Sequence, residues 1–150
     1  MKPLLVSCLL LTCLLTGCDG SRSFLKTAEG PVLYYERSMC FGPCPAFRLE
    51  VDPDGQARFN GRANVSPMGQ HEGTWPLEWL ECLADEAHAI GFADKAGAYD
   101  NPLIMDLPST RVTFGPHHIL DRVNGPDLGE FYAILDSLIA TTDWIPAKAP

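Results

Sequence analysis

Alternation of apolar and polar residues, the period of a strand with one buried face, marks residues 46–52. In this segment Phe47 and Leu49 lie on one side, and charged residues lie on the other. The next four residues, Asp52-Pro53-Asp54-Gly55, have proline and glycine at the positions that a tight turn favours. The pattern therefore predicts a hairpin that returns through residues 57–59.

The same alternation occurs in residues 110–114 and 118–123, which are separated by a Gly-Pro turn. These two segments predict a second hairpin. Further strands are expected at residues 32–39, where two tyrosines are central, and at residues 70–74.

Two other segments change to helical spacing. In residues 76–92 apolar side chains recur three and four positions apart, and Pro76 suits the first position of a helix. A second helix is expected after Gly125-Pro126, and its predicted buried face consists of Leu128, Phe131, Leu135 and Leu138. The order ββββ-α-ββ-α predicts an α+β fold with an antiparallel sheet of five or six strands and two helices on one face.

The first residues have the pattern of an export signal. One lysine is followed by an apolar run from Leu4 to Leu15, which is shorter than the roughly 20 residues that a membrane span needs. Leu15-Thr16-Gly17-Cys18 then resembles a bacterial lipobox, in which the cysteine becomes an acylated N-terminus with fatty chains such as palmitate. We therefore expect residues 1–17 to be a lipoprotein signal peptide and Cys18 to be lipidated. An ordinary secretory peptide, or an uncleaved anchor, is the alternative.

This expectation divides the chain into the signal peptide, a lipidated cysteine with a tether at residues 18–30, and a single α+β domain at residues 31–145. The protein is then expected in the bacterial cell envelope, held to the membrane by its lipid and facing the periplasm. Asp19 resembles the inner-membrane retention signal of enteric bacteria and favours the inner over the outer membrane, by a rule that varies between lineages.

The charge of the chain excludes one class of partner. The net charge is −8, and without residues 1–17 the chain keeps 10 basic and 19 acidic residues, a charge of −9. Such a chain repels nucleic-acid phosphates, so we expect no nucleic-acid binding. A basic protein or a cationic ligand is compatible with this charge.

Cysteine usage depends on the compartment. After export Cys40, Cys44 and Cys82 are left, and neighbouring cysteines outside the cytoplasm normally pair. The stretch SMCFGPCP places Cys40 and Cys44 around a tight connection between two predicted strands, because Gly42 and Cys44 precede prolines and avoid helical angles. The sequence favours a structural Cys40–Cys44 disulfide, with Cys82 as a free thiol.

Redox and metal chemistry are the alternatives for this pair. A redox thiolate is usually activated at a helix N-terminus, whereas a predicted strand follows Cys44. The spacing Cys-x-x-x-Cys-Pro resembles the copper motif of the Sco-type copper chaperones, in which the motif leads into a helix. That resemblance implies Cu(I) bound by Cys40 and Cys44, with Met39 and His117 or His118 as further ligands.

A longer set of motifs extends through most of the chain after Cys18. Its parts are Cys-x-Gly-x-Cys-Pro-x-aromatic at residues 40–47, a turn with Asp54-Gly55, the glycines Gly69 and Gly73, a helix ending at Gly91-Phe92, and a loop from Tyr99 to Asp106. Together these parts resemble a family of bacterial exported domains of unknown function, many of them lipoproteins. The resemblance implies an α+β layout, with the paired cysteines and Asp106 as signature positions, and it implies no reaction.

Motifs of common enzymes are absent from the sequence, including Gly-x-Ser-x-Gly, a phosphate loop and a zinc-protease motif. We therefore lean against an enzyme and expect no cofactor. The predicted function is a lipid-anchored, non-catalytic binding domain with an unknown envelope protein or ligand as its partner. The alternative is copper or thiol handling through Cys40 and Cys44.

Overall fold

The computed structural model describes residues 19–26 and 29–148. The predicted signal peptide and Cys18 lie outside the described residues. Within the part that is described, no helix combines the length and the apolar character needed to cross a membrane.

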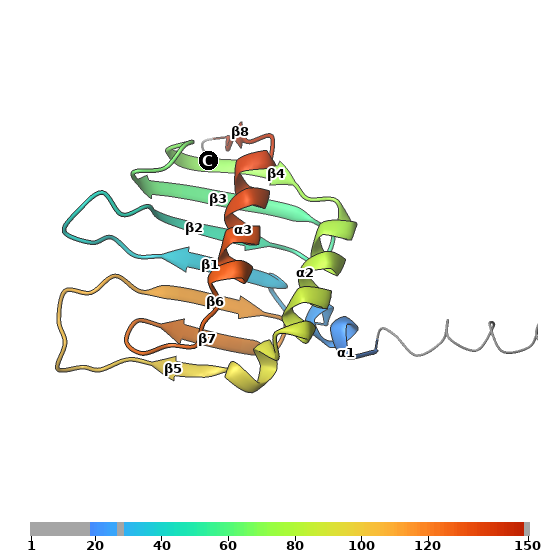
Figure 1. Ribbon diagram of the computed structural model, residues 1–150. Coiled ribbons are helices and arrows are strands. Elements are labelled where there is room, and N and C mark those ends of the chain that lie inside the picture. The colour runs from blue at the N-terminus through green and yellow to red at the C-terminus, as the bar shows by residue number, and fades with distance from the viewer. Residues whose placement is uncertain (1–18, 27–28, 149–150) are drawn as a thin grey trace, which may run out of the picture.

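One mixed sheet of eight strands forms a layer in the order β5-β7-β6-β1-β2-β3-β4-β8 (Figure 1). The strands are β1 (Leu33–Arg37), β2 (Ala46–Val51), β3 (Gln56–Ala63), β4 (Gly69–Thr74), β5 (Gly97–Tyr99), β6 (Thr110–Phe114), β7 (His117–Asp121) and β8 (Ile145–Pro146). Neighbouring strands are antiparallel except for β5 and β7, which are parallel.

Two long helices, α2 (Leu77–Ala89) and α3 (Gly129–Thr141), lie across the same face of the sheet (Figure 1). The short helix α1 (Asp19–Arg22) and the 3-10 helices η1 (Ser23–Leu25) and η2 (Phe92–Lys95) pack beside α2. Among the described residues no helix covers the opposite face of the sheet, which we call the open face.

The predicted antiparallel sheet of five or six strands with two helices is wrong. The described residues form eight strands in a mixed sheet, and they form three α-helices. The added strands β5 and β8 have three and two residues, too few to show an alternation. Pairing with the rest of the sheet defines them instead. At the end of β5, for example, the Tyr99 carbonyl accepts hydrogen bonds from the amides of Arg122 and Val123, which directly follow β7.

The core lies between the sheet and the two long helices. Strand positions that face the helices are apolar and buried: Leu33, Tyr35, Leu49, Val51, Phe59, Val112, Phe114 and Ile119. The helices contribute Leu80, Leu83, Phe131 and Leu135. Burial of this apolar surface is the main force that stabilises the two layers.

The segment that was expected to be a tether contributes to this core. Phe24 in η1 is only 2 % exposed, and its ring lies 5.4 Å from the Phe114 ring and 6.0 Å from the Phe92 ring. The hairpin turn at Gly115 has φ +56°, and a Cβ atom there would overlap the Phe24 carbonyl. Only glycine therefore permits both this turn and the close approach of η1. The packed unit begins before residue 31.

Candidate functional site

Three loops lie at one end of the sheet, the end toward which β1, β3 and β5 run (Figure 1). They comprise residues 38–45, 64–68 and 100–109. We call this the loop end. Helix α1, where the described chain begins, lies at the opposite end of the sheet (Figure 1).

The first loop is closed by a disulfide between Cys40 and Cys44, whose Cα atoms are 5.8 Å apart, and this prediction is confirmed. The Asn64 side-chain amide donates to the Cys44 carbonyl at 3.0 Å and joins this loop to its neighbour. Phe41, between the two cysteines, is nevertheless 91 % exposed. The disulfide thus constrains the backbone of a loop whose aromatic side chain faces solvent.

The loop of residues 100–109 is held by the Arg122 guanidinium. It donates to the Asp100 carboxylate at 3.0 Å, to the Ile104 carbonyl at 2.9 Å and to the Leu107 carbonyl at 3.3 Å. Guanidinium provides several donors in a rigid plane, so a single side chain can fix three points of one loop. Asp106, the predicted signature acid, lies exposed in this loop with φ +69°, a conformation that aspartate tolerates better than most residues.

Hydrogen bonds join these two loops. The Ser38 amide donates to the Ser109 carbonyl at 2.9 Å, and the Ser109 amide donates to the Ser38 hydroxyl oxygen at 2.8 Å. The disulfide loop and the loop of residues 100–109 therefore form one connected surface.

Apolar side chains gather on this surface. Of the ten large hydrophobic side chains that are exposed in the described part of the chain, seven belong to the three loops. They are Met39, Phe41, Met68, Leu103, Ile104, Met105 and Leu107, which we call the apolar tip. Leu103, at 88 %, is almost as exposed as Phe41. A concentration of exposed apolar side chains at one end of a folded domain is typical of an interaction surface.

The open face carries a second feature close to the loop end. Glu36 of β1 is 7 % exposed, and the register places Arg48 of β2 and Arg111 of β6 directly opposite it. Its carboxylate accepts hydrogen bonds from Tyr34 and Arg62, both at 2.8 Å. Arg48 and Arg111 approach it to 3.5 Å each. We call these five residues the Glu36 cluster.

Opposing effects act on the pKa of Glu36. Burial raises this pKa, but hydrogen bonds from Tyr34 and Arg62 and the positive charges of Arg62 and Arg48 outweigh burial. The net result is a pKa below the ordinary value, so the carboxylate is ionised at neutral pH. Three guanidinium groups around one carboxylate leave the cluster with a charge of +2, in a chain whose net charge is −8.

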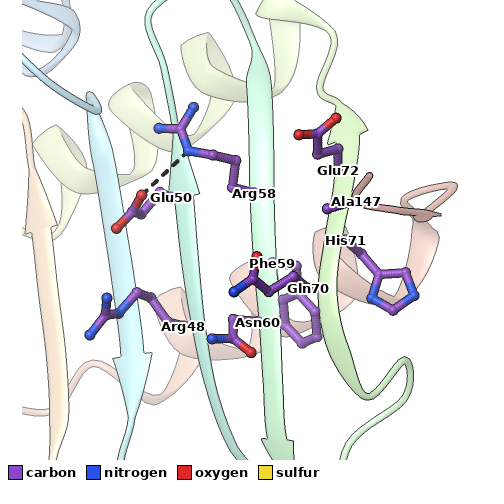
Figure 2. Close-up of a pocket in the computed structure, with 9 residues that line it drawn as sticks. All are labelled: Arg48, Glu50, Arg58, Phe59, Asn60, Gln70, His71, Glu72 and Ala147. Atoms are coloured by element: carbon purple, nitrogen blue, oxygen red, sulfur yellow. Dashed lines mark hydrogen bonds and ion pairs between the residues drawn. The ribbon is translucent and has the colours of Figure 1, made fainter. Parts of the chain in front are cut away.

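The part of the open face farther from the loop end is acidic. Arg58 of β3 donates to Asp52 at 2.8 Å. It also approaches Glu50 at 3.4 Å (Figure 2). Glu72 of β4 lies opposite Arg58 in the strand register and adds a third carboxylate to this part of the face. In Figure 2 the Glu50 carboxylate lies between the guanidinium groups of Arg58 and Arg48, and its negative charge also acts on Arg48. The acidic part of the face therefore adjoins the Glu36 cluster at Arg48.

A shallow hollow of about 200 Å³ lies beside Arg48 on the open face (Figure 2). Asn60, Gln70 and Glu72 are among the residues that line it. Amide and carboxylate groups of this kind can exchange hydrogen bonds with hydroxyl groups.

The residues of the copper alternative are not brought together. His117 begins β7 at the end of the sheet opposite the disulfide loop, and its ring lies 5.2 Å from the Phe24 ring. His118 contacts the Thr113 hydroxyl at 2.9 Å, away from Cys40. Across residues 19–26 and 29–148, no group of three or more His, Cys, Asp or Glu side chains is arranged to hold a metal ion. Cys82 is a free, exposed cysteine on α2.

Sequence reasoning missed the Glu36 cluster. Its arginines come from three strands, and only the pairing of β1 with β2 and β6 brings Arg48 and Arg111 to one carboxylate. The available signal was an outward arginine in two of the predicted strands, Arg48 in residues 46–52 and Arg111 in residues 110–114, whereas Arg62 lies beyond the strand predicted at residues 57–59. That signal does not reveal which strands are neighbours.

The profile of a family described as a domain of unknown function, DUF6438, matches residues 31–139. The chain belongs to this family. No curated protein and no solved structure matches the chain. The DUF6438 match includes the apolar tip and the Glu36 cluster, and it begins after Phe24.

Replacing Cys40 and Cys44 together with serine is expected to lower the free energy of unfolding by about 2 kcal/mol. The reason is that a disulfide closing so short a loop removes only a modest amount of unfolded-chain entropy. Urea unfolding followed by circular dichroism measures this change. Cys82→Ser is the control, because Cys82 is exposed and unbonded, and it is expected to stay within about 0.5 kcal/mol of the wild type. Equal effects of the two replacements would contradict a stabilising role for the disulfide.

Proposed function

We propose that this DUF6438 domain is a lipid-anchored, non-catalytic protein of the bacterial envelope that binds a protein partner through its apolar tip. The observation that carries the proposal is the exposure of Phe41 and Leu103 on two loops that are held in place by a disulfide and by Arg122. Apolar side chains supply no acid, base or nucleophile, so binding is the chemistry that this surface offers.

The energetics favour a binding role. Burying a side chain the size of phenylalanine or leucine stabilises a complex by roughly 1.5–3 kcal/mol, and several such side chains lie together in the apolar tip. A partner would not need to order these loops, because their backbones are already fixed. Surfaces organised in advance lose less entropy on binding and give higher affinity.

The position of helix α1, which follows Cys18, bears on whether the apolar tip meets a protein or the anchoring membrane. Helix α1 begins at Asp19, the residue after Cys18, at the end of the sheet opposite the loop end (Figure 1). With Cys18 acylated, the anchoring bilayer lies near α1, and the apolar tip points away from it into the periplasm. A protein is therefore a better occupant than the anchoring membrane.

Charge complementarity defines that occupant further. Arg48, Arg62 and Arg111 lie near the strand ends that lead into or out of the loop end. A partner segment that presents apolar side chains beside carboxylates would match both the tip and its positive border. Net charge alone makes a basic partner compatible, whereas the local charge beside the tip favours an acidic segment at this border.

Crosslinking at the tip tests the proposal. A photo-crosslinking amino acid is placed at Phe41 or at Leu103 in the native host, with Ile134 on α3 as the control position, because it is also apolar and exposed. We expect one and the same protein to be captured from both tip positions and not from Ile134. A peptide containing the crosslinked segment of that protein should then bind the purified domain, and Phe41→Ala should weaken the binding by roughly tenfold or more.

Three other outcomes of the crosslinking experiment would overturn the proposal. Capture of a second copy of this chain would indicate self-association, and adducts with lipid would indicate a membrane-binding tip. Absence of a discrete adduct at both tip positions would exclude the tip as a stable interface.

Copper or thiol handling, the alternative, requires Cys40 and Cys44 as free thiols. In the disulfide each sulfur is already bonded to the other, and His117 lies at the far end of the sheet. No observation on the described residues favours this alternative over binding.

A further inference from the structure

We infer that the Glu36 cluster is a binding site for a doubly charged oxyanion of the phosphate-ester type. The inference goes beyond the proposed function, in which these arginines serve only as the positive border of the apolar tip, because it assigns them a ligand of their own on the open face. The juxtaposition that carries it is the convergence of Arg48, Arg62 and Arg111 on a single buried carboxylate.

The charge of the cluster matches such a ligand. One carboxylate neutralises one of three guanidinium groups, which leaves +2 at one place on the surface. A phosphate monoester carries about −1.5 to −2 at pH 7, so one ester group would neutralise the excess.

The arginines have donors available for a ligand. Their side chains are between 36 and 52 % exposed, and each guanidinium has five N–H donors, of which the carboxylate occupies a minority. The Nε–H group of Arg48 is buried and has no hydrogen-bond partner. Planar guanidinium groups with free donors bind phosphate oxygens in pairs, a geometry that lysine cannot provide.

The acidic character of the whole chain does not prevent this binding. At physiological ionic strength charges farther apart than about 8 Å are largely screened, so the local charge decides. On the same face Asp52 and Glu50 are engaged by Arg58, which reduces their effect on the cluster. Glu50 also acts on Arg48, so Arg62 and Arg111 are the arginines of the cluster farther from the acidic part of the face.

The neighbouring hollow indicates what the oxyanion is attached to. It lies beside Arg48, has a volume of about 200 Å³, and is lined in part by Asn60, Gln70 and Glu72 (Figure 2). Such polar groups suit hydroxyl groups better than an apolar chain. The ligand class is therefore a phosphate ester of a hydroxyl-rich molecule, either a soluble sugar phosphate or a phosphate headgroup at a lipid surface.

Calorimetric titration of the purified protein tests the site with defined probes. Glucose 6-phosphate should bind, and glucose, which lacks the charge, should not. Vesicles of phosphatidylcholine with phosphatidylinositol 4-phosphate, whose headgroup carries a phosphate monoester beside hydroxyl groups, test the lipid source, and binding to these vesicles alone would assign the site to a headgroup. Inorganic phosphate binding as tightly as glucose 6-phosphate would support the oxyanion site and overturn the role of the hollow. No binding of any phosphate probe would overturn the inference.

Two variants separate a ligand site from a purely structural cluster. Arg111→Gln should weaken glucose 6-phosphate binding roughly tenfold, because it removes a charged donor that Glu36 holds only loosely, at 3.5 Å. Glu36→Gln should strengthen binding, because the charge of the cluster rises to +3, and a structural role alone would produce neither shift. Arg22→Gln on α1 is the matched control for the change of charge. An equal loss in Arg22→Gln and Arg111→Gln would overturn the inference.

Discussion

Replacing Phe24 with alanine is expected to lower the free energy of unfolding by about 3–5 kcal/mol, the largest single effect that we predict for this domain. The Phe24 ring is buried and lies against the rings of Phe114 and Phe92, so its removal leaves a cavity between η1 and the end of β6. Urea unfolding of the purified protein, followed by circular dichroism, measures the change.

Phe41→Ala is the matched control for this prediction. It deletes the same atoms from a side chain that is 91 % exposed, so we expect a change within about 0.5 kcal/mol. If Phe24→Ala lowered the free energy of unfolding by as little as Phe41→Ala, the segment before residue 31 would not pack on the domain. The same result would restore the expectation of a tether there.

Local patterns were sufficient to locate several elements. The alternation in residues 46–52 corresponds to β2, and its apolar positions Phe47, Leu49 and Val51 are buried. Helical spacing predicted an apolar stripe at residues 80, 83, 84, 87 and 91. Its four positions within α2 are buried, Leu80, Leu83, Ala84 and Ala87, whereas Gly91 lies after the helix and is half-buried. Such elements could be predicted because one face of each meets the core, and that face repeats with the period of the element.

The prolines around the cysteines also gave correct local information. Gly42 and Cys44 precede prolines, which excludes a helix there, and the tight connection between β1 and β2 brings Cys40 and Cys44 within bonding distance. This inference needed only neighbours in sequence.

Features that depend on distant residues were not predictable in this way. Phe24 is one aromatic residue in an aperiodic segment, and its burial depends on the turn at Gly115 and on η2. The short strands β5 and β8 exist because longer strands offer them free edges. Recognising the Glu36 cluster requires the strand order β6-β1-β2-β3, which no local pattern contains.

Glu36→Gln is expected to lower the free energy of unfolding by about 3 kcal/mol at pH 7. Hydrogen bonds to charged groups contribute roughly 1.5–3 kcal/mol, and removal of this charge leaves three guanidinium groups facing one another. Partial exposure of the arginines keeps the loss from being larger, since water can solvate them. Glu72→Gln on β4, the same change at an exposed position of the open face, is expected to stay within about 0.5 kcal/mol.

The effect of Glu36→Gln should depend on pH with a defined sign. The pKa of Glu36 is lower in the folded protein than its ordinary value of 4.5, so the folded state favours the ionised form. The stabilisation from the carboxylate is therefore fully present above about pH 4.5 and is lost as pH falls through the folded pKa. Urea unfolding at pH 7, 5, 4 and 3 should show a constant difference between wild type and Glu36→Gln at the two higher values and a shrinking difference below them. A difference that is unchanged down to pH 3, while both proteins remain folded, would show that the ionised carboxylate does not stabilise the sheet through its arginines.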